Sequence, residues 1–107
     1  DGLAFDALRK LNKIAYILST EKNNVVSSRA NKLKVPVYQG IESKVEALNN
    51  IVQKHNTTLR NVLYVGNDIN DFEVMKICGI SACPSDSHKM IKQIVAFNFY
   101  YKSKKKT

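Results

Sequence analysis

Residues 62–71 read Val-Leu-Tyr-Val-Gly-Asn-Asp-Ile-Asn-Asp, and this stretch decides the predicted fold. Its apolar start, residues 62–65, has no polar alternation, which is typical of a strand covered on both faces in a parallel sheet. Gly66 then ends the strand and opens a polar turn with two carboxylates and two amides. Because hard divalent cations favour such oxygen ligands, the turn is a candidate Mg²⁺ site. The alternative is a turn that simply caps the helix beginning near Asp71.

Short apolar runs alternate with segments of helical periodicity along the rest of the chain. Strands are predicted over residues 14–18, 35–38, 62–65 and 80–83, with an edge strand over residues 97–101. Helices are predicted over residues 2–12, 24–33, 42–55, 72–77 and 87–95. Asp1 is expected to cap the first helix and Gly79 to end the fourth. The alternation predicts an α/β fold, a three-layer Rossmann-like parallel sheet with helices on both faces.

The loops that follow the strands carry the candidate binding residues, because ligands of such sheets bind beyond the carboxyl ends of the strands. Ser19 and Thr20 follow the first strand and offer two hydroxyls beside a helix start, a position that commonly binds a phosphoryl oxygen. The alternative is that they only cap the helix. Lys44 lies near a helix start, where a cation is unfavourable, so it indicates a nearby anion unless it is a plain surface lysine.

Length and composition limit the organisation of the chain. The 107 residues, 44% of them hydrophobic, are enough for one compact domain and too few for two. We expect one domain over residues 1–96, followed by an edge strand and basic tail over residues 97–107. No apolar run is long enough to span a membrane, and no secretory leader is visible. The sequence therefore predicts a soluble cytoplasmic protein without a membrane partner.

The formal net charge of +8 would suit a nucleic-acid-binding protein. Four lysines, however, lie within residues 102–107, and a charged run at a chain end is usually a solvated terminus. The chain also lacks the interleaved aromatic and basic residues expected of a nucleic-acid surface. We therefore expect no nucleic-acid partner. Cys78 and Cys83 have neither metal nor redox spacing and are predicted to be free thiols.

Three loops, taken in order, resemble a known family. The hydroxyl loop, a Tyr-Gln-Gly with a lysine four residues later, and Gly-Asn-Asp-x-Asn-Asp are similar to the haloacid dehalogenase superfamily. More narrowly, they resemble the small phosphatases that act on 3-deoxy-manno-octulosonate 8-phosphate. The sequence of residues 19–23 is more similar to that of the phosphatase-like domain of acylneuraminate cytidylyltransferases. The resemblance reaches about residue 96 and rests on residues 1–3, 17–19, 29, 32–33, 38–40, 44, 64–71, 74–75 and 85–88.

The resemblance implies a site, a cofactor and partners. By it, the substrate is a phosphorylated sugar acid, the cofactor is Mg²⁺, and the protein is a homo-oligomer, a tetramer in the family. A phosphoryl group would be bound by a hydroxyl and neutralised by an ammonium. The residues implied are Ser19 and Lys44 as catalytic, Thr20 and Gly40 as substrate-binding, and Asn67, Asp68 and Asp71 as metal ligands.

Departures from the family pattern leave two functions open. Family members carry an Asp-x-Asp pair on a central first strand, and it supplies the nucleophile. This chain has no such pair, so we expect the pair and its strand to lie upstream in the native polypeptide. Asn67 stands at a usually acidic position, and Glu21 replaces an arginine. The predicted function is an incomplete or inactive copy of a phosphatase domain; the alternative is a non-catalytic assembly domain of an acylneuraminate cytidylyltransferase.

Overall fold

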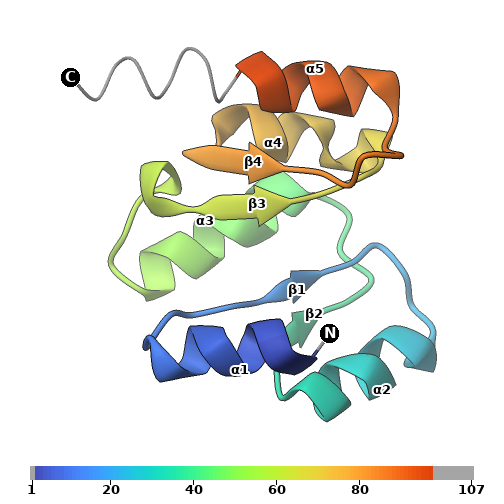
Figure 1. Cartoon of the computed structure of the whole chain (residues 1–107). Helices are drawn as coiled ribbons and strands as arrows, with labels where there is room; N and C mark the ends of the chain where they lie inside the picture. The colour runs from blue at the N-terminus through green and yellow to red at the C-terminus, as the bar shows by residue number, and fades with distance from the viewer. Residues whose placement is uncertain (1, 98–107) are drawn as a thin grey trace. The chain divides into compact units, whose positions relative to one another are not determined.

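The computed structural model describes residues 2–97, which form two compact units divided after Ser43 (Figure 1). The predicted edge strand and basic tail lie outside the described residues, except that Phe97 is the last residue of a helix. The predicted cap Asp1 also lies outside them. The division into residues 1–96 and 97–107 therefore stays a prediction.

The first unit contains two helices and two parallel strands, α1 (Gly2–Lys10), β1 (Ile17–Leu18), α2 (Asn24–Leu33) and β2 (Val37–Tyr38). Ile17 pairs with Val37, and Leu18 pairs with Tyr38. Helix α2 begins after Asn23, whose side chain accepts a hydrogen bond from the backbone N–H of Val25. The chain thus forms a β-α-β unit, as the sequence predicts.

Both strands of the first unit are shorter than predicted. The residues before β1 run without a ladder, and the first bond is donated by the N–H of Ile17 to the carbonyl of Pro36 at 3.0 Å. Pro36 has no N–H to donate, so pairing on the other strand starts only after it. The rings of Tyr16 and Tyr38 stack with their centres 5.6 Å apart and reinforce this pairing.

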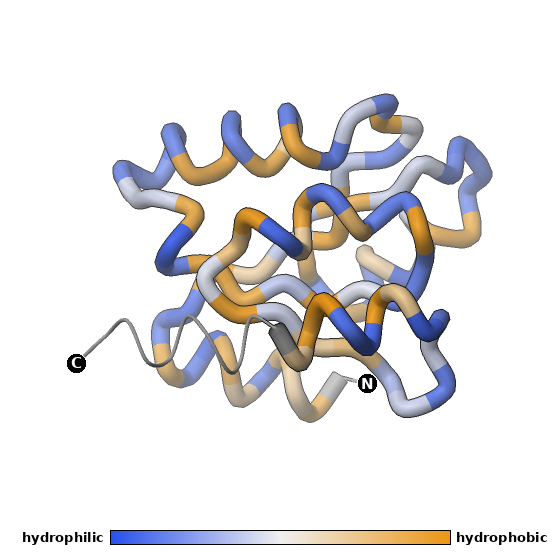
Figure 2. Tube along the Cα trace, turned by 90° about the horizontal axis from the view of Figure 1, so that it is seen from above, coloured by the Kyte–Doolittle hydropathy of each residue, from blue (hydrophilic) through white to orange (hydrophobic). Residues whose placement is uncertain are grey.

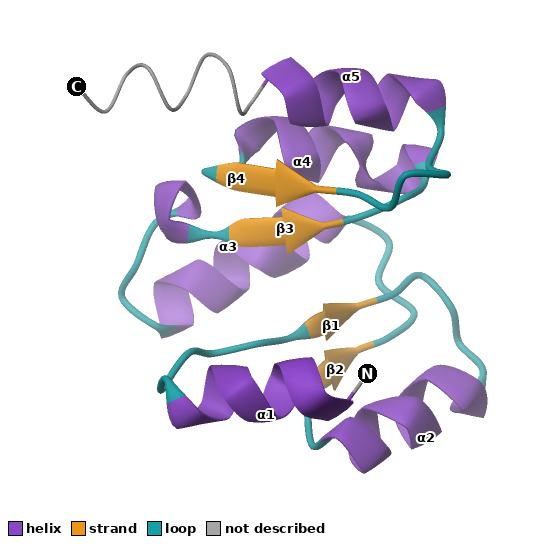
Figure 3. Ribbon diagram, viewed as in Figure 1, coloured by secondary structure: helices purple, strands orange, loops and turns teal. Residues whose placement is uncertain are grey.

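Over its described residues, 44–97, the second unit contains three helices, two parallel strands and two short 3₁₀ helices (Figure 3). Leu63 pairs with Ile80, and Val65 pairs with Ala82. Within the described residues, strand pairing therefore gives one two-stranded parallel sheet in each unit, and the α/β class is confirmed. The elements are α3 (Lys44–Lys54), η1 (Leu59–Asn61), β3 (Leu63–Val65), η2 (Ile69–Asp71), α4 (Phe72–Ile77), β4 (Ile80–Ala82) and α5 (Lys89–Phe97).

The core of the second unit is centred on α4, which contacts α3, α5 and both strands. The side chains that are most completely buried are Val74, Met75, Cys78 and Ile91. Along the helices, hydrophobic and hydrophilic positions alternate with helical periodicity, so one face of each can be buried (Figure 2). Cys78 is buried and Cys83 is half-buried, and no disulfide bond joins them. In the described part of the chain, no helix has the length and apolarity needed to cross a membrane.

Gly79 does not end α4 as predicted. The C-cap residue is Cys78, with a φ of −73°, so no left-handed glycine is used there. The N–H of Gly79 instead donates to the carbonyl of Leu59 at 2.9 Å. A Cβ at Gly79 would lie 1.9 Å from the carbonyl oxygen of Arg60. Glycine is therefore required because the backbone of η1 passes too close for any side chain.

Replacing Gly79 with alanine tests this explanation. The new Cβ would force η1 away from the start of β4, and we expect the Gly79→Ala protein to lose about 1–3 kcal/mol of unfolding free energy. Chemical denaturation of the intact protein measures the loss. Gln53→Ala, at an exposed position of α3, is the control and is expected to change stability by less than about 0.5 kcal/mol. Equal stability of the two variants would contradict the steric explanation.

Candidate functional site

The loop after β3 folds back on itself around Asp71. Gly66 makes this possible, because a Cβ there would lie 2.8 Å from the Asp71 side chain. The N–H of Gly66 donates to the carbonyl of Ala82 at 3.1 Å, which holds the loop start against β4. Asp68 then caps η2 in a capping box with Asp71. The turn therefore caps η2 through Asp68, whereas Asp71, the N-cap residue of α4, makes no side-chain capping bond to that helix.

The carboxylate of Asp71 accepts hydrogen bonds from four donors although the residue is only 4% exposed. Its Oδ1 atom accepts from Lys44 Nζ at 2.6 Å and from the Tyr64 hydroxyl at 2.6 Å. Its Oδ2 atom accepts from the backbone N–H groups of Asn67 at 3.2 Å and Asp68 at 3.3 Å. A buried charge is tolerated only when it is paired and hydrogen-bonded in this way.

The two acidic groups of this cluster have shifted pKa values. Burial raises the pKa of the Asp71 carboxyl, but the hydrogen bonds from Lys44 and Tyr64 and the positive charge of Lys44 outweigh it and lower the pKa overall. Burial is also the largest cause that raises the pKa of the Tyr64 hydroxyl, and the hydrogen bond to Asp71 adds to it. Asp71 is therefore a stable anion and Tyr64 a stable neutral donor at neutral pH.

Lys44 is the first residue of α3 and faces an anion of this chain, Asp71. Its side chain is only 11% exposed. The ammonium group also donates to Asn70 Oδ1 at 3.2 Å. An ammonium has three N–H donors, so one remains for a ligand after these two bonds. The pair thus fixes a lysine in place while leaving part of its donor capacity unused.

Asn67 and Asp68 are exposed at the outer side of the same loop. Asp68 Oδ1 accepts from the N–H of Ile69 at 2.7 Å, which orients this carboxylate. In the described residues, no group of three or more His, Cys, Asp and Glu side chains could hold a metal ion. The loop therefore offers a partial set of oxygen ligands. Mg²⁺ commonly accepts such a set and completes its coordination with water and phosphate.

The other predicted site residues belong to the first unit and form a second cluster. Ser19 follows β1, and its Oγ accepts the N–H of Glu21 at 3.1 Å. Thr20 is exposed, and Gly40 has a φ of +60°, a conformation that favours glycine. The stem of Lys22 lies over Gly40, since a Cβ there would approach Lys22 Cγ to 3.2 Å. The structure thus brings these loop residues together beyond the carboxyl ends of β1 and β2.

Two residues of these clusters were not predicted. Tyr64 was interpreted as part of a buried strand and of the family resemblance, with no role for its hydroxyl. A buried tyrosine needs a partner for that hydroxyl, and this signal could have found it. Gln39 was noticed only as part of Tyr-Gln-Gly. Its side-chain amide donates to the carbonyls of Glu21 at 3.2 Å and Asn23 at 2.6 Å. No local pattern shows which loop a glutamine will contact.

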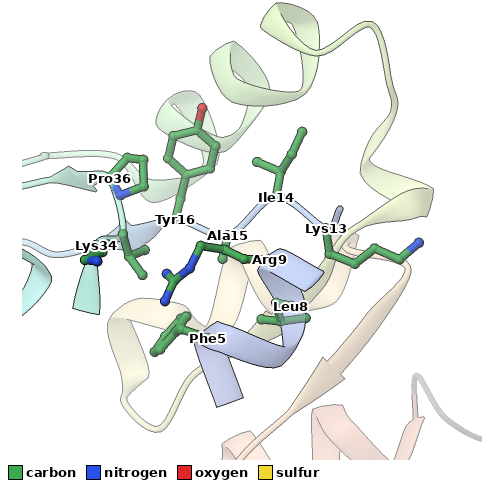
Figure 4. Close-up of a pocket in the computed structure, with 10 residues that line it drawn as sticks. Phe5, Leu8, Arg9, Lys13, Ile14, Ala15, Tyr16, Lys34 and Pro36 are labelled. Carbon is green, nitrogen blue, oxygen red and sulfur yellow. The ribbon is translucent and has the colours of Figure 1, made fainter. Parts of the chain in front are cut away.

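A cavity of about 200 Å³ lies elsewhere in the first unit (Figure 4). Its lining residues come from α1 and from the segments that precede β1 and β2, so it lies at the opposite strand ends from Ser19. Arg9 at its rim donates to the carbonyl of Leu33, the last residue of α2, and pairs with Asp6. Lys34 is the C-cap residue of α2. Because cations are stabilised at helix C-termini, the positions of Arg9 and Lys34 beside the cavity are explained without a ligand.

The fold and the polar loops are those of a Rossmann-like α/β protein, and each unit has a cluster of candidate residues at the carboxyl ends of its parallel strands. The model of the haloacid dehalogenase-like hydrolase family matches residues 3–105. The chain belongs to this family.

Two curated relatives are phosphatases that share one name. The chain is 30% identical to the 3-deoxy-D-manno-octulosonate 8-phosphate phosphatase of Salmonella typhi over 92 residues, 85% of this chain and 49% of the relative. It is 32% identical to the Escherichia coli K12 phosphatase of the same name over 76 residues, 70% of this chain and 40% of the relative. The chain thus spans about half the length, or less, of these curated relatives.

Solved structures are similar over most of the chain. A Streptomyces avermitilis protein assigned to the same family is 40% identical with a TM-score of 0.83, over 87% of this chain and 53% of that one. The Moraxella catarrhalis 3-deoxy-D-manno-octulosonate 8-phosphate phosphatase, solved with magnesium, phosphate and the sugar acid, has a TM-score of 0.81 over 87% of this chain and 54% of that one. At 23% identity, the second likeness supports the fold alone.

The buried pair predicts a pH-dependent loss of stability in an Asp71→Asn protein. Near neutral pH the variant leaves Lys44 without its counter-ion, and we expect it to be about 3 kcal/mol less stable. Because the pKa of Asp71 is lowered on folding, its contribution is complete above the ordinary value of about 3.9 and fades as pH falls below it. The stability difference between variant and parent should therefore shrink below about pH 4.

Denaturant titrations of the intact protein between about pH 7 and pH 3 measure this difference. Asp86→Asn is the matched control, because Asp86 is exposed and has no ion pair with a described residue. We expect this control to follow the parent within about 0.5 kcal/mol throughout. A stability deficit for Asp71→Asn that is the same at all pH values would show that the carboxylate charge is not the cause.

Proposed function

We propose that the chain is part of a phosphatase that acts on a phosphorylated sugar acid of the octulosonate or nonulosonate class. In this proposal, Ser19 and Lys44 bind and neutralise phosphoryl oxygens. The observation that carries the proposal is the Lys44 ammonium, held by Asp71 and Asn70 with one N–H donor left over. Family membership and the named phosphatase relatives support it. A fixed, partly desolvated cation is suited to the charge that spreads over phosphoryl oxygens during transfer.

In this proposal the hydroxyl and ammonium groups have separate roles. In the first unit, Ser19 is proposed to donate its hydroxyl hydrogen to a phosphoryl oxygen. In the second unit, Lys44 is proposed to supply the positive charge that neutralises a phosphoryl group. Thr20 and Gly40 border the substrate on the Ser19 side. Asp71 does not contact the substrate, because its four accepted hydrogen bonds already occupy both oxygens. Its role is to hold Lys44 and the loop in place.

Magnesium fits the outer side of the metal loop better than its interior. Asn67 and Asp68 are exposed and would provide a carbonyl and a carboxylate oxygen, whereas Asp71 would have to break buried hydrogen bonds. When bound, Mg²⁺ stabilises negative charge on phosphoryl oxygens. Because Asn67 brings no charge, we expect weaker metal binding than an aspartate would give. The 107 residues contain no Asp-x-Asp pair, so the proposal for them is limited to binding and charge neutralisation.

The second candidate is a non-catalytic assembly domain of an acylneuraminate cytidylyltransferase. Two residues favour it: Asn67, which removes a charge from the metal loop, and Glu21, which adds a negative charge beside Ser19. A homo-oligomer is part of both candidates. Phosphatase activity separates them, since an assembly domain would not hydrolyse phosphate esters.

The test needs the Asp-x-Asp nucleophile that these 107 residues lack, so it uses the native polypeptide. Its hydrolysis of p-nitrophenyl phosphate and of 3-deoxy-manno-octulosonate 8-phosphate, with and without Mg²⁺, tests the proposal. We expect Mg²⁺-dependent turnover, and a Lys44→Ala protein should lose about 100-fold or more in kcat because the phosphoryl charge is no longer neutralised. Lys44→Arg, which keeps the charge and the partner for Asp71, should recover part of the loss.

The control is Lys54→Ala, at the exposed end of the same helix, which should keep full activity. Circular dichroism checks that each protein is folded, since losing Lys44 leaves Asp71 unpaired. An inactive parent, or a folded Lys44→Ala protein with unchanged kcat, would contradict the proposal; an inactive but stable oligomer would favour the assembly domain.

A further inference from the structure

The Gln39 side chain connects the end of β2 to the loop that carries Ser19. Gln39 follows Tyr38, the last residue of β2, and is partly buried. Its amide nitrogen donates to the carbonyl of Asn23 at 2.6 Å and to that of Glu21 at 3.2 Å. We infer that Gln39 is a positioning residue that holds Ser19 for the phosphoryl group. This inference rests on the proposed function.

Backbone hydrogen bonds attach only the first half of the loop to β2 and the residues after it. The N–H of Ser19 donates to Tyr38, Ile41 donates to Ser19, and Gly40 donates to Glu21, at 2.9, 3.2 and 2.9 Å. The second half, ending at Asn23, is attached by the amide of Gln39. Asn23 is also the N-cap residue of α2, so Gln39 attaches the start of that helix as well.

The position of Glu21 decides the direction of the Ser19 hydroxyl. Ser19 Oγ accepts the N–H of Glu21 at 3.1 Å, which occupies a lone pair on the oxygen. The hydroxyl hydrogen is then directed away from Glu21 and can be donated. The carbonyl of Glu21 accepts from both Gly40 and Gln39, whereas the carbonyl of Asn23 is held by Gln39, so loss of the Gln39 amide removes one of the two donors to Glu21 and loosens residues 21–23. Ser19 would then lose the contact that orients its oxygen.

The chemistry of the side chain gives this inference a distinctive signature. Both acceptors of Gln39 are carbonyl oxygens, so the position requires a donor. Gln39→Leu removes the donor and keeps a similar size. Gln39→Glu places a carboxylate against two carbonyl oxygens, and the repulsion should disturb the loop more than leucine does. If Gln39 served only to fill space, Gln39→Glu would lower kcat no more than Gln39→Leu does.

Steady-state hydrolysis of p-nitrophenyl phosphate with Mg²⁺ by the intact protein is the test. We expect Gln39→Leu to lower kcat about tenfold or more, with a change in KM of less than about twofold, because a misplaced Ser19 weakens the transition state more than the bound substrate. Gln39→Glu should be slower still. Gln53→Leu, the same replacement at an exposed position of α3, should match the parent.

A double-mutant cycle separates positioning from a general structural effect. If Gln39 acts through Ser19, Gln39→Leu in a Ser19→Ala background should change kcat by less than about twofold. Independent, multiplying losses would overturn the inference while leaving the proposed function intact, as would an active Gln39→Leu protein with unchanged kcat. A parent without phosphatase activity would overturn the proposed function, and this inference with it.

Discussion

The buried carboxylate of Asp71 is the constraint on which the second unit depends. It joins the start of α3, the middle of β3 and the loop that leads into α4, because Lys44, Tyr64 and the loop amides all donate to it. Removing one partner from such a pair typically costs about 3–5 kcal/mol, because it leaves the other charge buried and unpaired. The same bonds that satisfy Asp71 also fix the ammonium of Lys44. The hydrogen bonds of Asp71 therefore both stabilise the second unit and hold the Lys44 ammonium in place.

The first unit also holds a polar loop in place, but without a buried charge. Its loop is attached to β2 by backbone bonds and by one neutral side chain, Gln39. A neutral amide costs less to desolvate than an ion pair but holds its partners less strongly. In each unit, a polar loop lies beyond the carboxyl ends of two parallel strands. A side chain that is at least partly buried holds the loop in place: Gln39 in the first unit and Asp71 in the second. This arrangement supports the proposed phosphoryl binding, in which the protein supplies position and charge.

The comparisons bear on function at two levels. They establish membership of the haloacid dehalogenase-like hydrolases, and the named relatives are phosphatases for one sugar acid phosphate. The chain spans about half of those relatives, so activity and substrate stay proposals. Asn67 is the residue where the two candidate functions differ most, because it decides how much negative charge the metal loop offers to a cation. Asn67 is exposed at the surface of the loop, so its missing charge does not affect the buried hydrogen bonds of Asp71 that hold the loop in place.

The sequence by itself determined the order and type of the elements and the loops that carry polar residues. The helix predicted over residues 24–33 is α2, Asn24–Leu33, and the strand predicted over residues 62–65 contains β3, because apolar periodicity and capping residues act locally. For Lys44 the sequence left two interpretations open, the partner of an anion or a plain surface lysine, and the buried ion pair decides for the anion. Only the tertiary structure decided that this anion is Asp71, 27 residues away, that Tyr64 and Gln39 support the loops, and that Gly79 is required by the backbone of η1 rather than by the end of α4. Contacts between distant segments depend on how the elements pack, and no local pattern of residues encodes that packing.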